Sequence, residues 1–333
     1  MAPMIDSAAA TRWLDRYQAG EHEIVWAEMT SIGPDVRSKP YLEPAWAVAQ
    51  ETMRRARHNI ETIVRRLDQI GYQFWDGRHG PADPQPMRVS IGGKAVAFSS
   101  VDAFIGSVME RDLSGHSPKL RQQLESMREQ TITMHAKLAT MRQATIAPRL
   151  PITSHLEDDT VFLAPEANTA AMIRKLEKAG MILPLSLKAW AEAVGNVNLS
   201  GAHPTLCFWR DENFPGVLAD PLMISLDDLM FQGEEWLDSH REGDATSQID
   251  VMLGYDANTK ADLAVVDEQI DGGYDIRLPA ANADAVLRNE PHQTHFVDCL
   301  RLAFRWGGFP GWENEKTRPE KELRFLSEGL LPI

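Results

Sequence analysis

Residues 168–195 read "NTAAMIRKLEKAGMILPLSLKAWAEAVG" and predict two short helices joined by a tight turn. Apolar residues recur at helical spacing before Gly180, and a glycine there supplies the backbone freedom that a turn requires. Pro184 favours the start of the second helix because its fixed φ suits a first helical turn, and Gly195 favours the end of that helix. The stretch therefore predicts a helix, a turn and a second helix that leads into the following segments.

Short strand candidates follow these two helices, separated by turn residues at intervals typical of a meandering antiparallel sheet. They are "VNLSG" at 197–201, "TLCFW" at 205–209, "PLMIS" at 221–225, "DVMLGY" at 250–255, "ADLAVV" at 261–266 and "YDIRLP" at 274–279. A further helix is expected over 294–305. Helices followed by strands and then by a helix predict an α+β fold with a mainly antiparallel sheet and flanking helices.

Two long amphipathic helices are predicted in the first half of the chain, over 44–71 and 118–147, after two short helices separated by Gly20. In both long helices the gaps between apolar residues alternate between four and three, which places one apolar seam along each. An antiparallel pair buries both seams most simply, and the alternative is that one seam forms a dimer. Between them, "RVSI" and "KAVAF" flank Gly92 and Gly93, which predicts a β-hairpin.

These patterns divide the chain into four parts. They are a helical region (1–78), an insertion with the hairpin and a short helix (79–117), a long helix that pairs with 44–71 (118–150), and an α+β domain (168–333).

The composition is that of a globular protein, with 43% hydrophobic and 25% charged residues among 333. No apolar run approaches the roughly 20 residues that span a bilayer, and the N-terminus lacks the basic start and apolar stretch of a secretory signal. Cys207 and Cys299 lie far apart in apolar contexts, which favours reduced thiols over a disulfide. These features predict a cytoplasmic protein without a membrane segment.

The net charge of −14 is distributed unevenly. Residues 1–150 hold 19 Lys and Arg against 17 Asp and Glu, whereas residues 151–333 hold 15 against 31. The second part therefore repels nucleic-acid phosphate and attracts basic molecules. We expect no direct binding of nucleic acid and a basic protein as partner, with solubility alone as the alternative explanation of the charge.

Motifs of the common enzyme classes are absent, including the Walker-type loop, G-x-G-x-x-G, H-E-x-x-H, G-x-S-x-G and paired C-x-x-C. His292, His295 and Asp298 are spaced by three, so the start of one helix would offer two imidazoles and a carboxylate to a divalent metal. The alternative is a structural helix entry capped by Thr294. We expect no catalytic residues, no cofactor and no metal, and keep a metal-dependent enzyme using His292 and His295 as the less favoured function.

Acidic segments with aromatic residues are the predicted binding surface. "RDENFPG" at 210–216 and "FQGEEWLDSHREGD" at 231–244 are expected to be loops with exposed rings, and an acidic turn is expected around 267–273. Exposed rings anchor a basic partner and carboxylates steer it to the surface. The predicted partner-binding residues are Asp211, Glu212, Phe214, Glu234, Glu235, Trp236, Asp238, Asp267, Glu268, Asp271 and Trp312.

The stretch "LRLAFRWGGFPGWENE" at 300–315 places four large rings around glycine and proline. Glycine and proline end the preceding helix, so we expect a structural turn in which Phe304, Trp306 and Phe309 are buried. Contact of Trp312 with a partner, or stacking of the rings on a small ligand, are the alternatives. The tail that follows is expected to form a last helix.

Two of these stretches carry a resemblance to a known family. "IRKLEKAGMILPLSLKAWAEAVGNVNLSGAHP" at 173–204 resembles the N-terminal signature of the SUKH superfamily, the Smi/Knr-like domains, and "GYDIRLPAANADAVLRNEPHQTHFVDCLRLAFRWGGFPGW" at 273–312 resembles the C-terminal part of long bacterial members. The resemblance covers 168–333, and the helices before it are similar to the N-terminal region of those long members. Where relatives tend to have a Lys and a Ser-Gly-Gly turn, this chain has Lys260 and, in place of the serine, Asp271.

The resemblance implies an α+β domain that serves as a protein-binding platform without shared catalytic residues. Many bacterial members are thought to be immunity proteins that neutralise toxins, often nucleases, and yeast members are regulatory interaction proteins. The sequence therefore predicts a protein-binding module, of immunity type, that recognises a basic toxin through an acidic surface. A regulatory adaptor is the alternative, and the chain is expected to be a monomer or a dimer.

Overall fold

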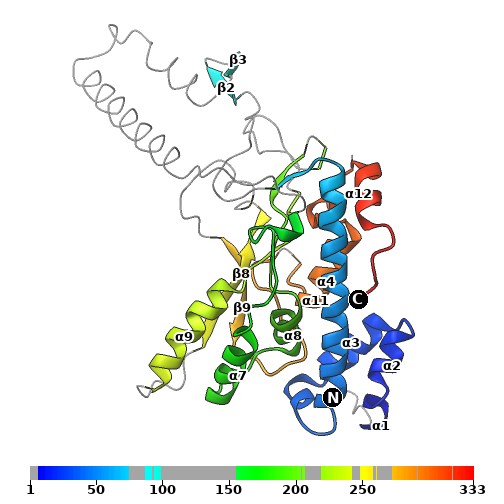
Figure 1. Ribbon diagram of the computed structural model, residues 1–333, viewed down its shortest axis with the longest axis vertical. Helices are drawn as coiled ribbons and strands as arrows, with labels where there is room; N and C mark the ends of the chain where they lie inside the picture. Colours follow the sequence, from blue (N-terminus) through cyan, green and yellow to red (C-terminus); the bar gives the residue numbers. More distant parts are fainter. Residues whose placement is uncertain are drawn as a thin grey trace, which may run out of the picture. The chain divides into compact units, whose positions relative to one another are not determined.

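The computed structural model is a mixed α+β structure with small antiparallel sheets (Figure 1). It describes residues 7–74, 87–91, 94–98, 155–203, 205–206, 219–241, 248–257, 260, 272–290, 292–316 and 318–333. The chain forms two compact units, of which the first comprises Met1–Pro81, Ser154–Arg210 and Gly216–Ile333. The second comprises Ala82–Thr153 and Asp211–Pro215. Among the described residues, no helix has both the length and the apolar character needed to cross a membrane.

The N-terminal region is helical, as predicted. It contains α1 (Ser7–Ala10), α2 (Trp13–Gln18), α3 (His22–Ser31), the 3-10 helix η1 (Gly33–Arg37) and α4 (Leu42–Gln69). Gly20, with φ of 107°, separates α2 from α3. Gly71, with φ of 74°, follows the end of α4, where the left-handed backbone favours glycine.

The predicted apolar seam of α4 is confirmed and is covered by its own chain. Its buried residues include Ala49, Met53, Ala56, Ile60, Ile63 and Leu67. The helices α2, α8 (Leu185–Ala193) and α12 (Glu320–Ser327) pack against α4 (Figure 1). The seam of α4 is therefore not available for a dimer. The predicted second helix over 118–147, and its pairing with 44–71, lie outside the described residues.

The helix pair at 168–195 forms as predicted. Here α7 (Thr169–Ala179) ends at Gly180, which has φ of 109°, and α8 follows Pro184. Six of the nine residues of α8 are buried, because the helix packs on α4 and also contacts α7 and α11 (Phe296–Arg305). Trp190 closes the helix by donating from Nε1 to the carbonyl of Gly195 at 2.7 Å. The core of the first unit therefore centres on α8.

The strands of the described residues form several small sheets rather than the single meandering sheet expected, and the strand candidates at 205–209, in large part, and at 261–266 lie outside those residues. One sheet has the antiparallel order β4 (Phe162–Leu163), β5 (Asn196–Asn198), β7 (Met223–Ile224). A second pairs β8 (Ile249–Tyr255) with β9 (Gly273–Leu278), and a third pairs β1 (Gln73–Phe74) with β6 (Gly201–Ala202). Ser225 donates its backbone N–H to Leu253 at 2.6 Å, which joins the end of β7 to β8. Apart from β8 and β9, the strands of the first unit have only two or three residues, which is too few for a long ladder.

The predicted hairpin is confirmed in the second unit. Strands β2 (Met87–Ile91) and β3 (Lys94–Phe98) pair antiparallel with Ile91 opposite Lys94. This register leaves Gly92 and Gly93 as a two-residue connection, the length that favours tight hairpins.

The helix α9 (Asp227–Arg241) corrects the sequence analysis, which predicted an acidic loop from residue 231. Within this helix, Gly233 allows α7 and α9 to approach closely. A Cβ atom at Gly233 would lie 3.1 Å from the side chain of Leu176 on α7. The glycine therefore serves helix packing rather than a turn.

The aromatic corner after α11 is a structural turn, as predicted. Phe304 and Phe309 are buried as predicted, whereas Trp306 is only half-buried, with the Arg318 guanidinium 4.4 Å from its ring centre. Gly307 has φ of 61°, and a Cβ atom there would lie 2.4 Å from Cβ of Leu326 on α12. The corner leads into the 3-10 helix η3 (Pro310–Asn314) and then into α12, the predicted last helix.

Candidate functional site

The structure places some of the predicted partner-binding residues and not others. Glu234, Glu235, Trp236 and Asp238 lie on α9, and Trp312 lies in η3. The remaining six are outside the described residues: Asp211, Glu212, Phe214, Asp267, Glu268 and Asp271. The described part of the predicted surface therefore lies mainly on α9.

Trp236 and Trp312 are not exposed as a binding role would require. Trp236 is 5% exposed, and its ring stacks on that of His240 with centroids 4.7 Å apart. Trp312 is 2% exposed and donates from Nε1 to the carbonyl of Leu206 at 3.0 Å. Both residues belong to the core. Trp236 lies on the buried side of α9, and Trp312 packs inside the aromatic corner.

Phe231 has the exposure that was predicted for Trp236. Its side chain is 63% exposed, the largest value among the exposed large hydrophobic residues of the described chain. Asp227, Glu234, Glu235 and Asp238 are also exposed. Residues spaced by three and four lie on one face of a helix, so these five form one surface. We call it the acidic face of α9.

The carboxylates of the acidic face differ from those in the interior of the domain. Glu177 on α7 binds Arg37 at 3.0 Å and Lys188 at 2.6 Å. Glu234 and Glu235 take part in no ion pair among the described residues. The sequence predicted an exposed aromatic ring among carboxylates, and the structure has such a ring at Phe231 instead of Trp236.

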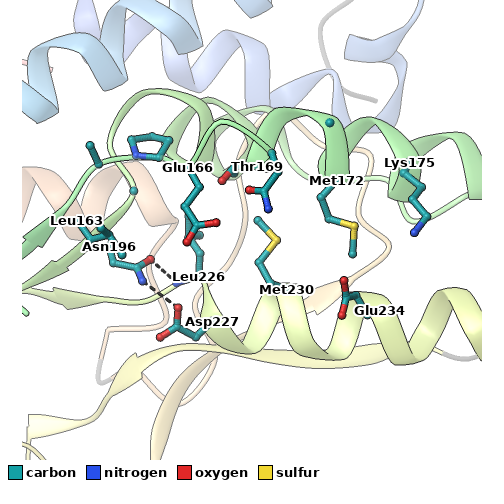
Figure 2. Close-up of a pocket in the computed structure, with 15 residues that line it drawn as sticks. Leu163, Glu166, Thr169, Met172, Lys175, Asn196, Leu226, Asp227, Met230 and Glu234 are labelled. Carbon is teal, nitrogen blue, oxygen red and sulfur yellow. Dashed lines mark hydrogen bonds between the residues drawn. The ribbon is translucent and has the colours of Figure 1, made fainter. Parts of the chain in front are cut away.

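A groove of about 520 Å³ lies between α7 and α9 and shares Asp227 and Glu234 with the acidic face. Figure 2 shows side chains from the two helices facing each other across it. Glu166 and Asp227 lie near the starts of the helices, Met172 and Met230 lie in the middle, and Lys175 lies opposite Glu234. The lining thus has three carboxylates against one ammonium.

Local contacts fix the carboxylate end of this groove. Asn196 donates from Nδ2 to Oδ1 of Asp227 at 2.9 Å, while its Oδ1 accepts from the backbone N–H of Leu226 at 2.9 Å. Gly195 has φ of 92°, and a Cβ atom added to Gly195 would lie 2.2 Å from the Leu163 carbonyl oxygen. The missing side chain therefore lets the backbone at Leu163 pass close to Gly195. This end of the groove is therefore built by backbone packing and by one amide.

The histidines proposed as metal ligands lie at a structural helix entry. His292 Nε2 lies 3.1 Å from Oε2 of Glu313, and Glu290 accepts from the backbone of His292 and Thr294. Within the parts of the chain that the structure describes, no three His, Cys, Asp or Glu side chains come together as a metal site requires. The geometry does not bring His292 and His295 into a ligand set.

The N-cap position of α11 is His295 rather than the expected Thr294, and a backbone N–H of the first helical turn is bound from outside the helix by Asp284. Its carboxylate accepts from the backbone N–H of Val297 at 3.1 Å and from its neighbour Ala285 at 2.9 Å. Burial raises the pKa of Asp284 to about 6, against the opposing effect of these hydrogen bonds and of nearby His295. The residue is a buried structural acid at the start of α11.

Comparison with family models, with curated proteins and with solved structures finds no match to this chain. The acidic face of α9 and the groove between α7 and α9 are therefore the features from which we infer a function.

Proposed function

We propose that this chain is a non-enzymatic protein-binding module that recognises a basic partner protein through the acidic face of α9. The observation that carries the proposal is the exposure of Phe231 among the carboxylates of Asp227, Glu234 and Glu235. An aromatic ring supplies the apolar anchor of an interface, and carboxylates raise the rate of encounter with a basic surface. Water is a poor environment for so large a ring, so its burial by a partner is favourable.

Within this class, we propose an immunity-type protein that neutralises a basic toxin, with a nuclease as the favoured kind. The resemblance of residues 168–333 to SUKH domains supports this role, as does the excess of 31 acidic over 15 basic residues in 151–333. Nucleases present basic surfaces to phosphate, so a dense acidic surface competes for the same sites. A regulatory adaptor would use the same face for a basic protein of its own cell.

Co-expression tests the proposal. The chain would be produced together with each basic toxin encoded beside its gene, and growth would be compared with that of cells that produce the toxin alone. We expect one toxin to be neutralised and to co-purify with the chain. Absence of both binding and rescue for all of them would contradict the immunity role, and binding without rescue would favour the adaptor.

A further inference from the structure

We infer that the groove between α7 and α9 is a subsite for one arginine side chain of the partner. The inference rests on the proposed function, because it assumes that a basic protein covers the adjacent acidic face. The groove holds about 520 Å³, which lies in the ordinary range of ligand pockets and leaves room for an arginine and the backbone that carries it.

The guanidinium would bind at the end formed by Glu166 and Asp227 (Figure 2). These carboxylates come from different segments, one before α7 and one at the start of α9. A guanidinium is planar and has five N–H donors, so it bridges two carboxylates, whereas an ammonium acts as a point charge. Asn196 holds Oδ1 of Asp227 at 2.9 Å, which orients that carboxylate before a ligand arrives. This arrangement favours arginine over lysine.

The arginine stem would pack between Met172 and Met230, which face each other in the middle of the groove (Figure 2). Both side chains are half-buried. Methionine is flexible and polarizable, so it adapts its shape to the long aliphatic stem of an arginine. An apolar middle with a charged end is the profile of an arginine side chain.

The two ends of the groove differ in charge, which fixes the orientation of the arginine side chain. Lys175 lies opposite Glu234 at one end, so this end is balanced in charge, whereas the other end has two carboxylates. A cation is therefore attracted to the Glu166 and Asp227 end and repelled by Lys175. Anionic ligands are disfavoured, because three carboxylates line the groove against one ammonium.

A set of three peptides tests the subsite on the full chain. The probe is a capped pentapeptide with one central arginine between leucines and alanines, and its matched controls carry lysine or the uncharged arginine analogue citrulline. Methyl resonances of methionine labelled with ¹³C would be followed, with Met172→Leu and Met230→Leu for assignment. We expect the arginine peptide to shift both resonances, the lysine peptide to bind several-fold more weakly, and the citrulline peptide to leave them unchanged.

Matched variants test the carboxylate end of the groove, where Asp227 belongs to the acidic face as well. The double variant Glu166→Gln, Asp227→Asn should bind the arginine peptide at least about tenfold more weakly, the loss expected for charge-assisted hydrogen bonds. Asparagine still accepts from Asn196, so the local structure is retained, and thermal unfolding checks the fold. Glu328→Gln, an exposed carboxylate after α12 that lies outside both the groove and the acidic face, should leave peptide binding unchanged. Equal shifts with arginine and citrulline, or full binding by the double variant, would overturn the subsite.

The two proposals fail in different ways. If Phe231→Ala abolishes binding of the toxin neutralised in co-expression while the Glu166→Gln, Asp227→Asn variant keeps it, the acidic face stands and the subsite is wrong. If the arginine peptide binds as expected but no toxin binds, the subsite stands for some other basic protein and the immunity role is wrong.

Discussion

The corner after α11 and the helix α9 both combine aromatic residues with glycine, but the corner buries Trp312 whereas α9 exposes Phe231. In the corner, Gly307 and Gly308 have positive φ and turn the chain back onto α12 and the core. In α9, Gly233 lies within a continuous helix and lets that helix approach Leu176. A glycine beside aromatic residues therefore does not by itself define a turn. Whether the backbone turns there or continues as a helix determines which ring reaches solvent.

The largest expected effect concerns the two rings themselves. Trp312→Ala should lower the free energy of unfolding by about 3–5 kcal/mol, because it leaves a cavity and removes the hydrogen bond to Leu206. Phe231→Ala should change it by no more than about 0.5 kcal/mol, because the ring is exposed. Urea unfolding of both variants measures the difference. Similar losses would show that the two rings do not differ in burial as described.

The glycines of the corner provide a second contrast. Gly307→Ala should cost about 2–4 kcal/mol, because the residue has φ of 61° and its Cβ would collide with Leu326. Gly329 has φ of 70° and no atom within 4 Å of an added Cβ, so Gly329→Ala should cost only about 1–2 kcal/mol. Denaturant unfolding of the pair isolates the collision from the backbone effect. Equal costs would argue against close packing of the corner on α12.

A smaller effect concerns the pH dependence of stability, through Asp284 at the start of α11. The pKa of Asp284 is raised to about 6 by burial, above the value near 3.9 of an unfolded chain. The protonated acid is thus favoured in the fold, so its contribution is full below pH 4 and is lost as the pH rises to about 6, by roughly 2–3 kcal/mol. Asp284→Asn retains an acceptor for Val297 and should lack this component. Parallel stability curves of both proteins from pH 4 to pH 7 would contradict the assignment.

Local sequence patterns predicted much of the helical structure. The alternating spacing identified α4, and Gly180, Pro184 and Gly195 correctly marked the limits of α7 and α8. The apolar seam of α4 predicted that this face is buried, but it did not predict that α8 covers it. An apolar seam does not specify which element packs against it.

The candidate site was predicted in composition but not in detail. Phe231 and Trp236 both lie in the same acidic segment, and five residues turn the chain about 140° around a helix, so the two rings point to different faces. Without α9 as a helix, the sequence could not distinguish them. The groove depends on the meeting of α7 with α9 at Gly233, which is a tertiary contact with no local signal.

The most direct test compares the acidic face of α9 with a similar surface on α12. Phe325 on α12 is 36% exposed and has exposed Glu328 nearby, so the double variant Phe325→Ala, Glu328→Lys matches Phe231→Ala, Glu235→Lys in chemistry. The affinity of each for the toxin neutralised in co-expression would be measured. We predict that the affinity of the α9 variant falls roughly 100-fold, because it lacks the Phe231 ring and carries a positive charge in place of Glu235. The affinity of the α12 variant should change little. Equal affinities of the two variants would contradict recognition through α9.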